Sequence, residues 1–354
     1  MSEMMIYGLS ALFACFGVMT FLLHRIETGI FPEDYEFKLD PFWYVITIMF
    51  LGATLSFFAF PVYGDMVHPV RYINILLPFV FAVLMYLCCL CGSLFFMKIA
   101  TFLGAAVISY MLPDDFQLFP EQLSLWQDRF VVVIFLFAIS RGLEMLNGLG
   151  AIASIQFCAV MMGAILIAYL GGLPQILGVI AFAYLGTMLA FTFLSWPPEK
   201  MIMSVGGFSS FGFILGCFAI NCSTEFAETP IFITLAYLVT EFFIAIYNRY
   251  ICFDKKEDLY MNTYYYQISD EGKNELAVVR GVLKIVAINV ILSIFQVAAQ
   301  DRLALPFFAV ALDLYFLSIL SGDNTPVKYF SLTQMGARTI KGIFSKRKNK
   351  DDGA

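Results

Sequence analysis

Charge is scarce in this sequence of 354 residues. Asp, Glu, Lys and Arg make up 14% of it, whereas soluble domains carry about 25%. This shortage excludes an ordinary soluble domain. Histidine is rarer still, with only His24 and His68. His68 follows Asp65 by three residues, and a surface loop explains it better than an acid/base pair. We expect no nucleic-acid partner.

Metal-binding patterns of cysteine are also missing. The eight cysteines lie in or beside apolar segments, and three of them form the run "CCLCG" at 88–92. A metal site needs convergent polar partners, and none is near this run in the sequence. Buried thiols without metal are therefore the better interpretation.

Apolar residues fill most of the chain, at 60%. A membrane-spanning helix needs about 20 apolar residues, and long runs of this kind recur along the sequence. The predicted spans are 5–23, 41–62, 72–92, 129–146, 150–170, 174–195, 207–221, 230–250, 280–299 and 305–321. The stretch 94–112 is ambiguous because Lys98 lies inside it. We expect an all-α, polytopic bundle of about ten or eleven transmembrane helices over 1–322.

The distribution of Lys and Arg predicts the orientation of the bundle. Seven basic residues lie in the segment 328–350 of the tail 323–354, which places the tail in the cytoplasm. Ten crossings would put the N-terminus there too. The same count places 63–71, 141–150, 195–207 and 251–279 on the cytoplasmic face, in the cytoplasmic membrane of a bacterium.

Polar residues interrupt the apolar runs in five places. The interruptions are "VYGDM" with Asp65, "RGLEMLNGLGAI" (141–152), "MSVGGFSSFGF" (203–213), "LVTEFFIAIYNRY" with Glu241, and "TYYYQ" (263–267). Ionisable residues at membrane depth are costly, so each is a candidate for function.

The order of these segments resembles the polyprenyl-phosphate sugar-1-phosphate transferase superfamily over roughly 41–321. That family has an aspartate pair, then N-x-x-N-x-x-D-G-x-D-G, then M-G-D-x-G-S-x-x-x-G-F, a helix with a carboxylate, and a His cluster. Here Asp65 stands for the second aspartate of the pair. Arg141 and Glu144 replace the two Asn residues, while Asn147 and Gly150 replace the two Asp residues. Val205 replaces the metal-binding aspartate, and tyrosines 264–266 replace the His cluster.

The resemblance implies a reaction that these replacements would disable. The family joins a sugar-1-phosphate from a UDP-sugar to a lipid phosphate, with Mg²⁺ and carboxylates supporting the two anions. Asp65 and Glu241 remain as catalytic or weak metal-binding candidates, and Glu144 and Asn147 stand in the altered motif. We expect no cofactor, with Mg²⁺ only if the chain is active.

Basic residues near the same face offer another way to bind an anion. The lipid-phosphate candidates are Arg141, Lys200, Arg249 and Arg280. Arg141 and Glu144 are also spaced to pair with each other on one helix, and we favour that internal pair.

Three functions stay open. The first is a catalytically degenerate relative that binds polyprenyl phosphate or another lipid and serves as a scaffold or regulatory subunit in envelope glycan assembly. Its protein partner would dock on the basic tail or the cytoplasmic loops. The second is a divergent active transferase, and the third is a transporter or flippase component.

Overall fold

The structure, a computed structural model, describes most of the chain. The described residues are 2–27, 40–59, 69–113, 116–118, 123–197, 201, 203–223, 228–246, 263, 274–299 and 304–320. Over these ranges the chain forms helices and no strand, which confirms the predicted all-α class. The basic tail falls outside the described residues.

Twelve α-helices and one 3₁₀ turn make up the described part of the bundle. They are α1 (Ser2–Glu27), α2 (Phe42–Ala59), α3 (Pro69–Leu90), α4 (Leu94–Met111), α5 (Leu125–Met145), η2 (Leu146–Gly148), α6 (Gly150–Tyr169), α7 (Gln175–Ser195), α8 (Val205–Ser223), α9 (Glu228–Thr234), α10 (Ala236–Ile246), α12 (Glu275–Ala299) and α13 (Ala304–Leu320).

Six of these helices are long and apolar enough to cross a membrane. They are α1, α4, α6, α7, α8 and α12. Shorter apolar helices lie in α2, α3, α10 and α13. The chain is therefore a multi-pass membrane protein, as its composition predicts.

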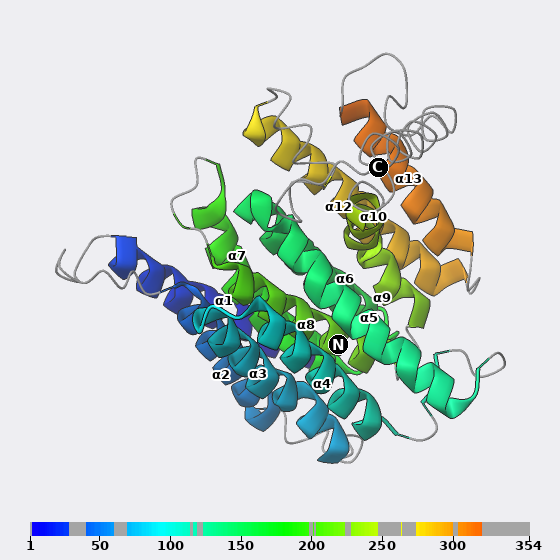
Figure 1. Ribbon diagram of the computed structural model, residues 1–354, viewed down its shortest axis with the longest axis horizontal. Helices are drawn as coiled ribbons and strands as arrows, with labels where there is room; N and C mark the ends of the chain where they lie inside the picture. Colours follow the sequence, from blue (N-terminus) through cyan, green and yellow to red (C-terminus); the bar gives the residue numbers. More distant parts are fainter. Residues whose placement is uncertain are drawn as a thin grey trace, which may run out of the picture.

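The helices pack around a central group. Figure 1 shows α1–α4 on one side of α5–α8, with α9, α10, α12 and α13 on the other. The apolar window of α8 is 94% buried, whereas that of α1 is 17% buried. The helix that begins at the "MSVGG" segment therefore lies in the middle of the protein, and α1 lies at its edge.

One end of the bundle gathers several interhelix connections, and we call it the polar end. It contains the start of α2, the turn between α3 and α4, the connection from α5 to α6, and the start of α8. Three contacts join these parts. Phe42 stacks on Tyr86 with ring centroids 3.8 Å apart. Gly206 packs against Cys89, and the Ser204 amide donates to Asp40 Oδ2 over 3.3 Å.

Helix α4 crosses the bundle, which resolves the ambiguity over 94–112. It starts at the polar end after a tight turn in which Gly92 has φ 75°, a value that favours glycine. The Ser93 hydroxyl caps its first turn. At its far end, the Ser109 hydroxyl donates to the Arg129 carbonyl over 2.8 Å. An 18-residue helix spans about 27 Å, close to the thickness of the membrane core.

The predicted span 230–250 is not one continuous helix, because it breaks at Leu235. α9 ends at Thr234 and α10 starts at Ala236, so the carbonyl of Thr234 leaves the regular helical pattern. The Gln156 amide of α6 donates to this carbonyl over 2.8 Å. A break at membrane depth is tolerated where neighbouring side chains satisfy the freed backbone groups.

Helix α1 starts and helix α13 ends at opposite ends of the bundle. The predicted cytoplasmic position of both termini stays a prediction, because the tail 323–354 lies outside the described residues. α1 runs parallel to α7, since Met4 packs at Gly178 and Leu12 at Gly186. It therefore starts at the end opposite the polar end. α12 ends beside Gly172, where Val297 packs, and α13 returns from there. The crossing of α4 adds one pass to the ten that the sequence predicted. The described path therefore makes an odd number of passes between the start of α1 and the end of α13.

The end of α2 and the start of α3, on either side of residues 60–68, do not lie at the polar end. α2 leaves the polar end at Phe42 and passes Ala183 of α7 at Gly52. α3 reaches the polar end at Tyr86, and Ile75, near its start, shares a small pocket with Asn221 at the end of α8. The end of α2 and the start of α3 thus lie at the end opposite the polar end. Residues 60–68 lie outside the described residues, so the prediction that 63–71 shares a face with 141–150 stays a prediction.

Candidate functional site

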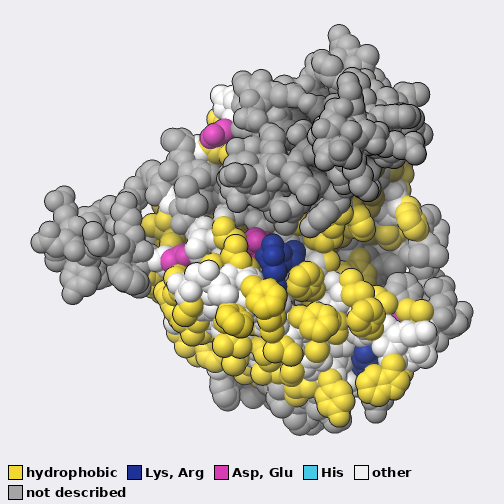
Figure 2. Space-filling view, viewed as in Figure 1, with side chains coloured by type: hydrophobic (Ala, Val, Ile, Leu, Met, Phe, Trp, Pro, Cys, Tyr) yellow, Lys and Arg dark blue, Asp and Glu magenta, His cyan; other side chains and the backbone are white. Residues whose placement is uncertain are grey.

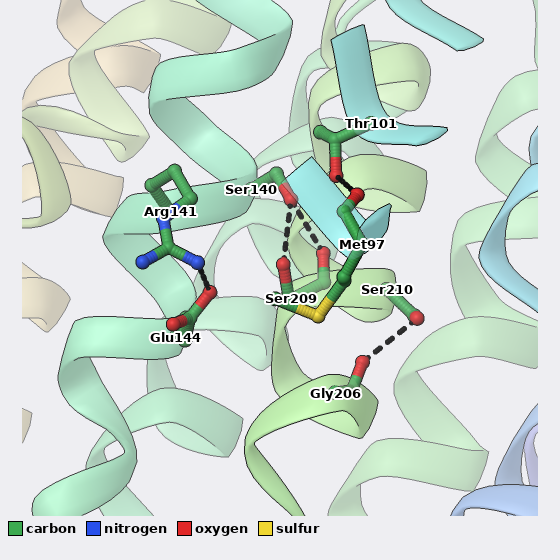
Figure 3. A network of polar contacts seen from close by, with 8 residues as sticks. All are labelled: Met97, Thr101, Ser140, Arg141, Glu144, Gly206, Ser209 and Ser210. Carbon is green, nitrogen blue, oxygen red and sulfur yellow. Dashed lines mark hydrogen bonds and ion pairs between the residues drawn. The ribbon is translucent and has the colours of Figure 1, made fainter. Parts of the chain in front are cut away.

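A close contact between α5 and α8 builds the polar end. The Ser140 hydroxyl donates to the Ser209 carbonyl over 2.8 Å and lies 3.1 Å from its hydroxyl. One turn further along α8, Gly212 lies against the backbone of Ser140, and Gly216 lies against Leu136. Small residues at this spacing allow helices to approach closely in membranes. Figure 3 shows this contact beside the ion pair described next.

Arg141 and Glu144 pair with each other on the last turns of α5. An Arg141 Nη1 donates to Glu144 Oε2, and both side chains are about nine-tenths buried. The Ser209 hydroxyl of α8 is also within hydrogen-bonding reach of the Glu144 carboxylate. The predicted internal pair is confirmed, and the α5–α8 contact holds it in place.

Lys98 is a second cation at this site, and it was not among the candidate residues predicted from the sequence. It acts electrostatically on Glu144. Its own side chain is exposed on the surface of α4, beside Phe95, Ile99 and Phe102, which are 69%, 38% and 47% exposed. The feature of the sequence that could have identified Lys98 was its position as a single lysine inside an 18-residue apolar run, since ionisable residues within membrane spans are often functional.

The surface around the site is mainly apolar. Figure 2 shows a basic patch near the centre with acidic atoms beside it, and a smaller basic area at the lower right, both set in a broad hydrophobic face. Exposed apolar side chains are expected on the lipid-facing surface of a membrane protein. A patch of mixed charge on such a face would meet the polar headgroups or the glycerol region of the lipid.

The altered motif forms the connection from α5 to α6. α5 ends at Met145, a 3₁₀ turn covers Leu146–Gly148, and α6 starts at Gly150, close to the predicted break. Asn147 lies in this turn, and its buried Oδ1 accepts no hydrogen bond. A buried polar atom without a partner costs about 1–3 kcal/mol, so the turn carries a stability cost that packing does not explain.

Asp40 is a carboxylate at the polar end that the sequence analysis missed. Its Oδ1 accepts a hydrogen bond from the Phe42 amide over 3.0 Å, which caps α2, and its Oδ2 accepts from Ser204. The signal was Asp-Pro immediately before an apolar run, which is typical of a helix start. Both carboxylate oxygens are thus occupied by backbone amides.

Val205 opens α8 with its side chain 38% exposed. The position at which the family resemblance expects a metal-binding aspartate therefore carries an apolar side chain at the polar end. Within the described residues, no three His, Cys, Asp or Glu side chains come together to bind a metal.

The remaining predicted residues divide into three groups. Asp65, Lys200 and Arg249 lie outside the described residues, as do tyrosines 264–266. Arg280 lies on α12 with an exposed side chain. Glu241 is fully buried on α10, where the Tyr237 hydroxyl donates to its Oε1 over 3.1 Å.

Comparisons with known proteins add no family to this description. No protein-family model matches the chain, and no curated protein matches its sequence.

Proposed function

We propose that the protein binds the phosphate headgroup of an isoprenoid lipid, of the polyprenyl-phosphate class, at the polar end beside α4 and α5. It would serve there as a non-catalytic, lipid-binding or scaffold subunit of envelope glycan assembly in a bacterial cytoplasmic membrane. The observation that carries the proposal is the position of Lys98, exposed among apolar side chains and next to the Arg141–Glu144 pair.

The charge balance of the site favours an anion. Lys98 and Arg141 bring two positive charges and Glu144 brings one negative charge, so these three residues carry one excess positive charge. Asp40, at the same end, is held by two backbone amides. A phosphate monoester would compensate the excess charge without a metal ion. Basic side chains bind phosphate through charge-assisted hydrogen bonds.

The depth of Lys98 suits a lipid rather than a soluble phosphate. It lies four residues into α4, which is about 6 Å along the helix axis. A lysine at this depth extends its ammonium group toward the headgroups while its methylene chain stays among apolar groups. Phe95 and Phe102, one turn away on either side, offer an apolar surface for an isoprenoid chain.

The active-transferase alternative is less well supported. It needs Asp65 to act together with carboxylates of the polar end. Asp65 is outside the described residues, and α2 ends and α3 starts at the end opposite the polar end. Val205 offers no ligand for the magnesium ion that such a reaction would use.

The test is a binding titration with the full-length protein in lipid nanodiscs. We expect undecaprenyl phosphate to bind, and Lys98→Gln to weaken its binding about tenfold, the effect of losing ~1.4 kcal/mol. Lys284→Gln is the matched control, because Lys284 is also an exposed lysine within a spanning helix, and it should leave binding unchanged.

Two lipids distinguish the headgroup from the chain. Undecaprenol lacks the phosphate, and phosphatidylglycerol lacks the isoprenoid chain, so both should bind at least tenfold more weakly. Equal binding of undecaprenol and undecaprenyl phosphate, or no effect of Lys98→Gln, would contradict the proposal.

A further inference from the structure

A second polar cluster lies between α10, α12 and α13. Asp313 of α13 is 1% exposed, and Asn289 of α12 and Glu241 of α10 are 0% exposed. The Asn289 amide nitrogen donates to both carboxylate oxygens of Asp313, each over 3.0 Å. Polar side chains enclosed in a membrane bundle are costly to bury, so the cluster calls for a functional explanation.

The electrostatic surroundings of Asp313 are unfavourable for a carboxylate. Among the described residues, the charged group that acts on it is Glu241, which carries the same sign. The basic residues of α12, Arg280 and Lys284, have exposed side chains and do not act on Asp313. A buried charge without an opposite partner costs several kcal/mol and is usually neutralised by a proton.

Asn289 supplies an independent indication of what neutralises Asp313. Its Oδ1 is buried and accepts no hydrogen bond, although its amide nitrogen already faces the carboxylate. A carboxylic acid and a primary amide can form two hydrogen bonds with each other, O–H to the amide oxygen and N–H to the acid carbonyl. One proton on Asp313, with a small rotation of the amide, would therefore satisfy the orphan oxygen.

We propose that Asp313 and Asn289 form a proton-binding site beside Glu241, in which a hydronium ion of the aqueous phase transfers a proton to a carboxylate oxygen of Asp313 and the new O–H donates a hydrogen bond to Asn289 Oδ1. One O–H bond of hydronium breaks, one O–H bond on Asp313 forms, and a water molecule is released. The site is distinct from the lipid-phosphate site at the polar end, and it holds whether or not the protein binds a lipid there.

Infrared difference spectroscopy tests the protonation state without requiring a reagent to reach the site. The full-length protein is compared with Asp313→Asn, which imitates the neutral side chain and should fold. At pH 7 we expect the wild-type spectrum to contain the carbonyl stretch of one neutral carboxylic acid that Asp313→Asn lacks. The band should shift in D₂O and disappear as the pH is raised.

Two further samples make the assignment specific. Asn289→Leu removes the acceptor, so the Asp313 band should move to the frequency of an acid without that hydrogen bond. Glu275→Gln removes an exposed carboxylate in the first turn of α12 and should leave the band unchanged. Absence of the acid band at pH 7 would overturn the proposal. Loss of the band on adding Na⁺ at constant pH would also overturn it, because the site would then bind a metal cation in place of the proton.

Discussion

Gly212 of α8 lies directly against Ser140 of α5. A Cβ atom at position 212 would come within 2.8 Å of the Ser140 Cα and within 2.9 Å of two backbone oxygens. The glycine is therefore required for the close approach of the two helices, and this approach brings Ser209 to Glu144.

Replacing this glycine tests the contact. We expect Gly212→Ala to lower the free energy of unfolding by about 1–3 kcal/mol, because backbone atoms cannot move aside cheaply. Gly17→Ala is the control, since Gly17 is also helical and its added methyl group would meet nothing within 4 Å. It should be neutral or slightly stabilising. Equal stabilities of the two variants in detergent unfolding would contradict the assigned contact.

The end of α4 depends on a buried arginine of α5. Arg129 is 8% exposed, and its guanidinium donates to the carbonyls of Leu112 and Pro113. We expect Arg129→Met to destabilise the protein by about 2 kcal/mol, since charged hydrogen bonds contribute about 1.5–3 kcal/mol each and the apolar replacement recovers part of the loss. Thermal unfolding measures the change. Arg280→Met removes an exposed arginine, and a comparable loss in this variant would refute a specific role for Arg129.

The Arg141–Glu144 pair predicts a non-additive response. Arg141→Leu leaves a nearly buried carboxylate without its main partner, so it should cost about 3 kcal/mol. The double variant Arg141→Leu/Glu144→Leu removes both charges and should recover most of this loss. A double-mutant cycle based on chemical unfolding checks the coupling, and additive losses would show that the pair is not formed.

The direction of the helices predicts an inverted arrangement of the two ends of the chain. In a cysteine-free background, we expect a cysteine at Ser2 and one at Ser345 of the basic tail to react with a membrane-impermeant thiol reagent from opposite sides. Cys91, exposed in the turn at the polar end and restored as the single cysteine of this background, should react from the same side as residue 345. Labelling of positions 2 and 345 from one side would contradict the crossing of α4.

The sequence predicted the helical class and most helix positions, because apolar runs of about 20 residues have few other structural solutions. It also predicted the break at 146–150 and the Arg141–Glu144 pair, both of which follow from local spacing. The sequence left the crossing of α4 undecided, because Lys98 lowers the hydropathy of 94–112. The long side chain of a lysine can nevertheless extend to the membrane surface from within a spanning helix. The crossing of α4 puts the start of α1 and the end of α13 at opposite ends of the bundle.

Contacts between distant helices were beyond the reach of local patterns. The pairing of Asn289 with Asp313 joins residues 24 positions apart, and each alone looks like an isolated polar residue in an apolar helix. Residues 63–71 were assigned to the cytoplasmic face by counting crossings back from the basic tail, and that count depends on whether 94–112 crosses. The turn at Cys91–Ser93 occupies the polar end.

The proposed lipid site can be tested most directly by native mass spectrometry of the full-length protein extracted from its own membranes. The account predicts that wild-type protein carries a polyprenyl phosphate and that Lys98→Gln carries clearly less, while Lys284→Gln retains it. Protein that carries only bulk phospholipids, to the same extent in all three samples, would contradict a polyprenyl-phosphate site at the polar end.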